Sequence, residues 1–217
     1  MFSKLDIWNL ALAMIRAKLV QSENEDSLEA QHCRLHYPSV IASLLEGPHD
    51  WGFATRRMVL NAVTNDRDAE WLYAYGLPAD MASPTFVLPD LDGLGLGVPI
   101  PLPGNPYFEV WSTLREQLAA PYIIENGVLY TNAENASLGY ITSEIEPGAI
   151  PAKLVDAIAA ELAARLAMPV KGDKKLRDEY RNEAEGLRQR AMADDANRQP
   201  MSQHPYVSEA ERVREGY

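Results

Sequence analysis

Hydrophobic residues recur at helical spacing in two runs over the first 45 residues. Between positions 4 and 20 they return every three or four residues, which places one set on a single helix face: Leu5, Trp8, Leu12, Ile15 and Leu19. The polar segment 22–27 (SENEDS) provides turn and capping residues. A second helix is predicted beyond it, with the stripe Ala30, Cys33, Tyr37, Val40, Ile41, Leu44 and Leu45. Pro38 lies inside this stripe and predicts a bend or a break near Tyr37.

A short third helix is predicted from about residue 50 to residue 63, after Gly47-Pro48. Alternating spacing then replaces helical spacing. Residues 70–78 (EWLYAYGLP) place Trp71, Tyr73 and Tyr75 on one face of a strand. The pair Asn126-Gly127 separates two β-prone runs and predicts a hairpin, because both central residues of such a turn must tolerate positive φ. A further strand is predicted over about 138–145, and the Pro- and Gly-rich segment 89–106 predicts a long exposed loop.

Helical spacing returns in the last third of the chain. One alanine-rich helix is predicted from about Pro151 to Pro169, with Leu154, Ile158, Leu162 and Leu166 in one stripe. A second, from 173 to about 193, has a narrow stripe flanked by charges of both signs, which indicates a helix that lies on the surface or awaits a partner: Leu176, Tyr180, Ala184, Leu187 and Ala191. Beyond Asn197 the chain has too few apolar residues to fold alone.

Together these elements predict an α+β fold that is mainly α. Residues 1–64 and 148–195 form a helical bundle, residues 65–147 form an inserted small antiparallel β unit with the long Gly/Pro loop, and residues 196–217 form an extended C-terminal tail.

Composition narrows the class of protein. A chain of 217 residues that is 47% hydrophobic can bury a core without disulfides or metal, and its single cysteine excludes an intramolecular disulfide. The chain shows no charged-then-apolar leader, so we expect a cytoplasmic origin. No window approaches the ~20 apolar residues of a membrane span, so no membrane partner is expected. The net charge of −11 disfavours nucleic-acid binding, which depends on basic residues that neutralise phosphates.

Candidate catalytic and metal-binding patterns are weak. His32 and His36 flank Cys33 one turn apart, but no second cluster of ligands exists, so we expect no metal. The segment DLDG at 90–93 opens like a calcium loop, yet Pro101 occupies the twelfth position where a bidentate Glu is required. The glycines of GLGLG precede prolines rather than a helix, so no phosphate site or other cofactor site is predicted. We therefore expect a protein that is not an enzyme.

Interaction surfaces are the better candidates. Trp51 and Phe53 precede the pair Arg56-Arg57, an arrangement that fits either nucleic-acid stacking or a structural corner; two arginines in an acidic chain favour the second. The candidate subunit or partner interface comprises Trp51, Phe53, Arg56, Arg57, Tyr73, Tyr75, Leu176, Tyr180, Leu187, Tyr206 and Tyr217.

Four sequence blocks, taken in order, resemble a known protein family over roughly residues 10–195. They are ALAMIRAKLVQSENEDSLEAQHCRLHYPSVIASLLEGPHDWGFATRRMVL, WLYAYGLPAD, YIIENGVLYTNAENASLGYI and LVDAIAAELAARLAMPVKGD. The chain resembles the head-to-tail adaptor family of short-tailed double-stranded DNA bacteriophages, also called tail tubular protein A. The matching positions are Ser27, Ala30, Cys33, Tyr37, Leu44, Leu45, Trp51, Phe53, Ala54, Arg57, Leu60, Trp71, Tyr73, Tyr75, Leu77, Pro78, Asp80, Leu129, Thr131, Tyr140, Leu162, Ala163, Leu166 and Ala167.

The chain departs from the family pattern in three places. Ser39-Val40 stands where the family usually carries an arginine, which leaves one pairing between helices or subunits in doubt. The loop 89–106 with the following FEVWSTLREQLAA, and the tail after Asn197, have no counterpart that we can match.

The resemblance implies a virion protein of the tail or neck. Family members form a ring, of twelve copies in the best understood cases, between the portal protein and the tail nozzle (tail tubular protein B), and the genome passes through it during ejection. We expect double-stranded DNA to pass without specific binding. Residues 173–217 are expected to dock on the portal and to become ordered only there; Tyr73, Tyr75 and the loop 89–106 would face the nozzle or tail fibres. The alternatives are a tail-associated cell-wall hydrolase and a small nucleic-acid-binding regulator.

Overall fold

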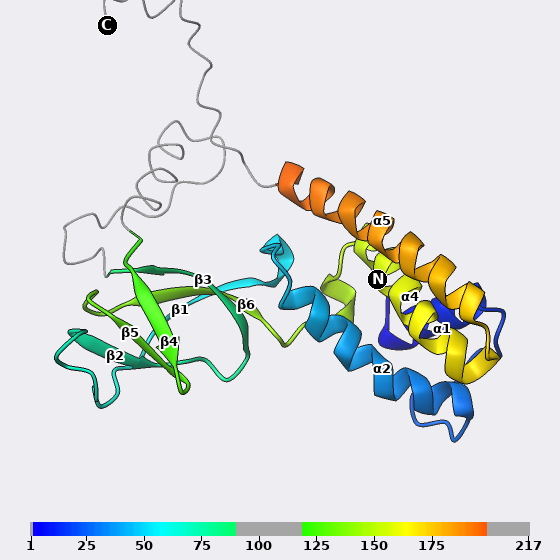
Figure 1. Cartoon of the computed structure of the whole chain (residues 1–217), viewed down its shortest axis with the longest axis horizontal. Coiled ribbons are helices and arrows are strands. Elements are labelled where there is room, and N and C mark those ends of the chain that lie inside the picture. Colours follow the sequence, from blue (N-terminus) through cyan, green and yellow to red (C-terminus); the bar gives the residue numbers. More distant parts are fainter. Residues whose placement is uncertain (1, 90–118, 199–217) are drawn as a thin grey trace, which may run out of the picture.

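The computed structural model describes residues 2–89 and 119–198, and it has the expected α+β, mainly α class (Figure 1). A helical bundle and a β unit lie side by side. The helices of the described ranges are α1 (Lys4–Met14), α2 (Leu28–Leu45), α4 (Ala152–Leu166) and α5 (Lys174–Arg198). The strands are β1 (Thr55–Val59), β2 (Tyr73–Gly76), β3 (Met81–Leu88), β4 (Tyr122–Glu125), β5 (Val128–Thr131) and β6 (Ser137–Thr142).

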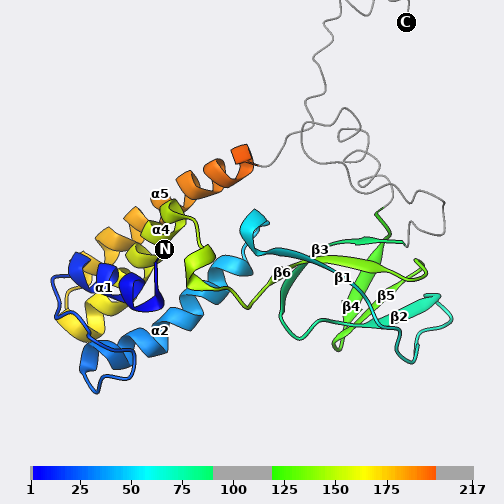
Figure 2. The ribbon, with the colours of Figure 1, turned by 180° about the vertical axis from the view of Figure 1, so that it is seen from behind.

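Helix α4 is the centre of the bundle, because α1, α2 and α5 all pack against it (Figures 1 and 2). Its alanines let neighbouring helices approach closely, and its large apolar residues, among them Leu154, Ile158 and Leu162, are fully buried. They meet Trp8 and Leu12 of α1 in one continuous core. The predicted stripe of this helix is confirmed, and Pro151 is its N-cap residue.

The N-terminal helices begin at side-chain caps. Ser3 and Asp6 form a capping box at α1, and Ser27 caps α2. Helix α1 ends at Met14, short of the predicted end near residue 20, and Asn9 then holds the returning chain through two hydrogen bonds to the backbone of Val20. Of the bend or break predicted near Tyr37, the break is wrong, because α2 continues through Pro38. Pro38 is exposed, and its missing N–H leaves the carbonyl of Arg34, four residues earlier, without its helical donor.

Helix α5 packs along the bundle of its own chain and runs three residues into the segment predicted as tail. Leu176, Tyr180 and Leu187 are half-buried against the bundle core, and the Tyr180 hydroxyl donates to the Met14 carbonyl at 2.6 Å. The helix was predicted to lie on the surface or to await a partner, and it lies on the surface of the bundle. Residues 174–198 are helical in the single chain, so the expectation that they become ordered only on docking is wrong, while docking on the portal stays a prediction. The predicted stripe packs against α4 and, through Tyr180, against the end of α1 of the same chain.

The β unit consists of two three-stranded antiparallel sheets with the orders β1-β6-β3 and β2-β5-β4. Two backbone links join the sheets. The segment after β1 pairs with β2 through the Val63 N–H to the Ala74 carbonyl, and the Ala120 N–H ahead of β4 donates to the Val87 carbonyl of β3. The order β3-β6-β1-β2-β5-β4 therefore nearly closes on itself around a second core, which includes Leu129 and Leu138.

The third helix predicted over residues 50–63 is wrong. Trp51 precedes a single 3₁₀ turn (Gly52–Ala54), and β1 follows directly and pairs with β6. Residues 55–59 therefore belong to the β unit, which begins earlier than the predicted boundary at residue 65. Arg56, Arg57 and Met58 have good helix propensity, but pairing with β6 outweighs this local preference.

The hairpin at Asn126-Gly127 is confirmed, with φ of 49° and 78° at the two turn residues. The strands predicted around Tyr73-Tyr75 and near residue 138 are also present. Strand β3 was not predicted, because Pro84 interrupts its pattern. In β3, Phe86 lies opposite Gly139 of β6 and covers the space that a side chain at that glycine would fill.

Several predicted features fall outside the described residues. These are the loop 89–106 apart from Pro89, most of the segment 108–120, the tail beyond residue 198, and with it Tyr206 and Tyr217. No helix in the described part of the chain has the length and apolar character needed to cross a membrane.

Candidate functional site

The corner between the bundle and the β unit is built around Trp51, a predicted site residue that is 1% exposed. Its indole N–H donates to the Leu44 carbonyl at the end of α2, at 3.1 Å. The ring of His49 meets the indole edge-on at a centroid distance of 4.5 Å, and Phe53 lies beyond it at 6.0 Å. The predicted corner at Trp51 and Phe53 is present, although it anchors the end of a helix and the start of a strand.

Asp195, in the last turns of α5, ties the far end of the chain to this corner. One of its carboxylate oxygens pairs with Nε2 of His49 at 2.9 Å and accepts the backbone N–H of Gly52 at 3.1 Å. The neighbouring Asp194 pairs with Lys153 at the start of α4. Segments almost 150 residues apart are thereby held in one place, which fixes how the chain leaves the bundle for the β unit.

Arg56 and Arg57 lie on β1 and make their contacts within the β unit. Arg56 pairs with Asp80 at 2.8 Å, and the same carboxylate accepts the hydroxyls of Tyr140 and Thr142. Burial alone would raise the pKa of Asp80, but these hydrogen bonds and the guanidinium outweigh it and hold that pKa below its usual value. The guanidinium of Arg57 lies over the ring of Phe86, 5.3 Å from its centroid.

The two tyrosines proposed as an outward-facing surface differ in how deeply the structure buries them. Tyr73 and Tyr75 stack at a centroid distance of 6.4 Å on β2. Tyr75 is buried and its hydroxyl donates to the Ala133 carbonyl, so it belongs to the β core, while Tyr73 remains partly exposed. Only Tyr73 of this pair is placed to contact another molecule.

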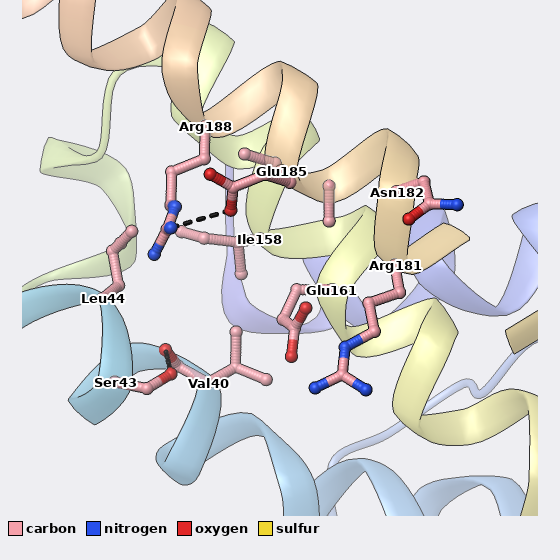
Figure 3. Close-up of a pocket in the computed structure, with 11 residues that line it drawn as sticks. Val40, Ser43, Leu44, Ile158, Glu161, Arg181, Asn182, Glu185 and Arg188 are labelled. Atoms are coloured by element: carbon pink, nitrogen blue, oxygen red, sulfur yellow. Dashed lines mark hydrogen bonds and ion pairs between the residues drawn. The ribbon is translucent and has the colours of Figure 1, made fainter. Parts of the chain in front are cut away.

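A groove of about 420 Å³ lies between α2 and α5, with α4 as its floor (Figure 3). Apolar side chains from all three helices line part of it: Val40, Leu44, Ala157, Ile158 and Ala184. The other wall carries Arg181 and Arg188, which extend from α5 toward α2, and the carboxylates of Glu161 and Glu185 lie beside them (Figure 3).

The charges in this groove are only partly balanced. Arg188 pairs with Glu185 at 2.7 Å, and Glu161 pairs with Arg165, whose guanidinium also donates to Ser39. Arg181 forms no hydrogen bond or ion pair with any described residue, and Nε of Arg188 is buried without an acceptor there. The groove therefore combines guanidinium donors, two carboxylates and apolar side chains.

The sulfur and imidazole groups of α2 are placed as a structural cluster. Cys33 is buried, which raises the pKa of its thiol to about 12, the opposite of an activated nucleophile. The rings of His32 and His36 stack at 6.0 Å. Within residues 2–89 and 119–198, no group of three or more His, Cys, Asp or Glu residues is arranged to hold a metal ion.

A scan against protein-family models and a search of curated proteins both give no match to this chain.

The groove residues Arg181 and Arg188 were not among the predicted site residues. Their spacing of seven positions along a mixed-charge helix was the available signal, but the same pattern is typical of a solvated helix face.

Proposed function

We propose that this chain is a structural subunit of a bacteriophage virion, a head-to-tail adaptor that assembles as a ring between the portal and the tail nozzle. Several residues that carry the resemblance hold structural positions in this chain. Ser27 caps α2, while Ala30, Cys33 and Tyr37 lie in the bundle core and Trp51 holds the corner. These are positions whose side chains determine the shape of the subunit.

The observation that carries the proposal is the corner around Trp51 and Asp195. A ring subunit must present its faces at a fixed angle, because a small angular error per subunit accumulates around a closed ring. Here a buried indole, an aromatic cluster and a buried carboxylate fix the exit of the chain from the bundle. Partly buried polar contacts thus hold the two parts together.

Charge supports the same function. With a net charge of −11, the chain repels the phosphates of double-stranded DNA, a property that suits a channel through which DNA must slide. The nucleic-acid alternative would use Arg56 and Arg57. Arg56 pairs with Asp80, and the guanidinium of Arg57 lies over the ring of Phe86.

The hydrolase alternative depends on a carboxyl group with a raised pKa that can act as general acid. The groove contains two carboxylates, but hydrogen bonds from Gln189 and Arg188 lower the pKa of Glu185. Glu161 is engaged by Arg165. This arrangement keeps Glu185 ionised and favours binding over acid catalysis.

Electron microscopy of the purified chain, alone and mixed with the portal protein of the same phage, tests the proposal. We expect closed rings in at least one of the two samples, docked coaxially on the portal in the second. Absence of rings from both would refute the adaptor function. Zymography on cell-wall material and a DNA mobility shift across a salt series test the two alternatives, and we expect neither lysis nor binding at physiological salt.

A further inference from the structure

Strand β1 (Thr55–Val59) is open on an edge and on both faces. All five of its residues are exposed, and Val59 is 64% exposed, whereas a strand in a covered sheet buries every second side chain. Within residues 2–89 and 119–198, β1 pairs along its length with one strand, β6, which lies between β1 and β3. The other edge of β1 therefore has no described strand beside it.

The hydrogen bonds just after β1 show which backbone groups point to this open edge. The Leu60 N–H donates to the carbonyl of Ala136, next to β6, and in an antiparallel pair the bonding residues alternate. Even-numbered residues of this stretch therefore turn their backbone groups toward β6. Odd-numbered residues turn theirs to the opposite side, where Asn61 and Val63 bond to β2.

The backbone groups of Thr55 and Val59 point to the same side as those bonds to β2. Strand β2 ends at Gly76, and the chain then crosses to β3 on the far side of β6, so β2 does not extend along β1. An edge that presents backbone donors and acceptors in this way is a template for one further strand.

The C-terminal segment leaves α5 next to the start of this edge. Asp195 accepts the N–H of Gly52, three residues ahead of β1, and α5 ends three residues later at Arg198 (Figures 1 and 2). Extended chain covers about 3.3 Å per residue, so the eight residues from Arg198 to Tyr206 can span about 26 Å, whereas β1 is about 17 Å long. Both ends of the open edge are within their reach.

Residues 206–211 (YVSEAE) are the first run after α5 that suits a strand. Pro200 and Pro205 precede this run and lack the N–H that a ladder of hydrogen bonds needs, whereas the run itself contains no proline. Tyr206 and Val207 have high β propensity. The run has too few apolar residues to fold alone, but a strand that joins an existing sheet is held mainly by its backbone.

Charge favours this run over a second copy of β1 as the added strand. Strand β1 carries Arg56 and Arg57 at its centre, whereas residues 206–211 carry Glu209 and Glu211 and no basic residue. Two copies of β1 paired antiparallel would bring their arginines together, and like charges opposite each other in a sheet are destabilising. Residues 206–211 bring opposite charges to the same place.

We propose that residues 206–211 add a strand to the open edge of β1 in the same molecule, on the side of β1 away from β6. Backbone hydrogen bonds to Thr55 and Val59 hold this strand. It covers an edge that would otherwise be a template for pairing with other chains. The inference concerns the subunit itself and does not depend on the adaptor function.

Amide hydrogen exchange, followed residue by residue by NMR on the full chain, tests the pairing. The amides of Arg56 and Met58 face β6 and should be protected in every variant, so they serve as internal references. The amides of Thr55 and Val59 face the open edge, so they should exchange slowly only if a further strand lies beside them. We expect slow exchange at all four positions in the unmodified chain.

Proline substitutions identify the segment that provides the protection. The double change Val207→Pro and Ser208→Pro removes two neighbouring N–H groups, one of which faces β1 whatever the register. Exchange at Thr55 and Val59 should become about tenfold faster or more, with the two reference amides unchanged. Met201→Pro together with Ser202→Pro is the matched control, because it lies in the connecting residues between Pro200 and Pro205 and should leave the exchange as it is.

Four results would overturn the proposal. Fast exchange at Thr55 and Val59 in the unmodified chain would mean that the edge stays open. Protection that survives the change at Val207 and Ser208 would assign the edge to another segment. An equal loss in the control would point to a general effect of proline in the C-terminal segment. Protection that rises with protein concentration would show that a second copy provides the strand, whereas pairing within one molecule predicts the same protection at every dilution.

Discussion

Asp195 offers the sharpest test of the corner, because it is a carboxylate near the C-terminal end of a helix. It lies in the last turns of α5, where the helix dipole disfavours negative charge by about 0.3–1 kcal/mol. Its oxygen accepts from the ring of His49 and the N–H of Gly52, and its side chain is 11% exposed. The position is therefore explained only if those two hydrogen bonds outweigh the dipole.

The expected effect of Asp195→Ala follows from these terms. A hydrogen bond to a charged group contributes about 1.5–3 kcal/mol when buried, and the remaining exposure lets water replace part of it. After subtracting the relief of the dipole, we expect the free energy of unfolding to fall by about 2–3 kcal/mol. The backbone at Gly52 and in the following residues of the corner should also open locally more often than the rest of the bundle.

Urea unfolding measures the first effect and amide hydrogen exchange at residues 49–55 and 190–197 measures the second. Asp178→Ala is the control, since Asp178 is on the same helix and, among the described residues, pairs only with its neighbour Arg177. The substitution brings the same gain in helix propensity. A loss in Asp195→Ala no larger than in the control, with unchanged exchange at the corner, would refute the role assigned to this residue.

Three further substitutions test the β unit. Asp80→Asn should destabilise the protein by about 1–2 kcal/mol at neutral pH. Because the pKa of Asp80 is lowered in the folded state, its contribution to stability is present above the unfolded pKa of about 3.9 and disappears as pH falls through the folded pKa. Urea unfolding of the variant should therefore depend less on pH below about 4 than that of the unmodified chain. Gly139→Ala would place a methyl group 2.4 Å from the ring of Phe86, and a loss of about 1–3 kcal/mol in thermal or urea unfolding is expected; an unchanged midpoint would mean that the ring simply moves aside. Gly127→Ala, at φ of 78° with open space around it, should cost about 1 kcal/mol through backbone strain alone, and a neutral result in the same assay would contradict the turn geometry.

The sequence determined those parts of the fold that depend on local spacing. The stripes of α1, α2 and α4 indicate which faces meet, because a helix repeats every 3.6 residues whatever surrounds it. The Asn126-Gly127 hairpin was predictable for a similar reason, since the turn geometry itself requires residues that tolerate positive φ. The α+β class and the inserted β unit followed from the order of these patterns along the chain.

Contacts between distant segments were decided only by the tertiary structure. Strand β1 contains good helix formers, and its pairing with β6, about 80 positions later, overrides them. The stripe of α5 could serve a partner or its own bundle equally well, and only the packing on α4 shows that the bundle uses it. The groove with Arg181 and Arg188 likewise exists because α2 and α5 are separated across α4, an arrangement that no local pattern encodes. Local spacing fixes the surface that each element offers, whereas burial of apolar area and satisfaction of buried polar groups decide which surfaces meet.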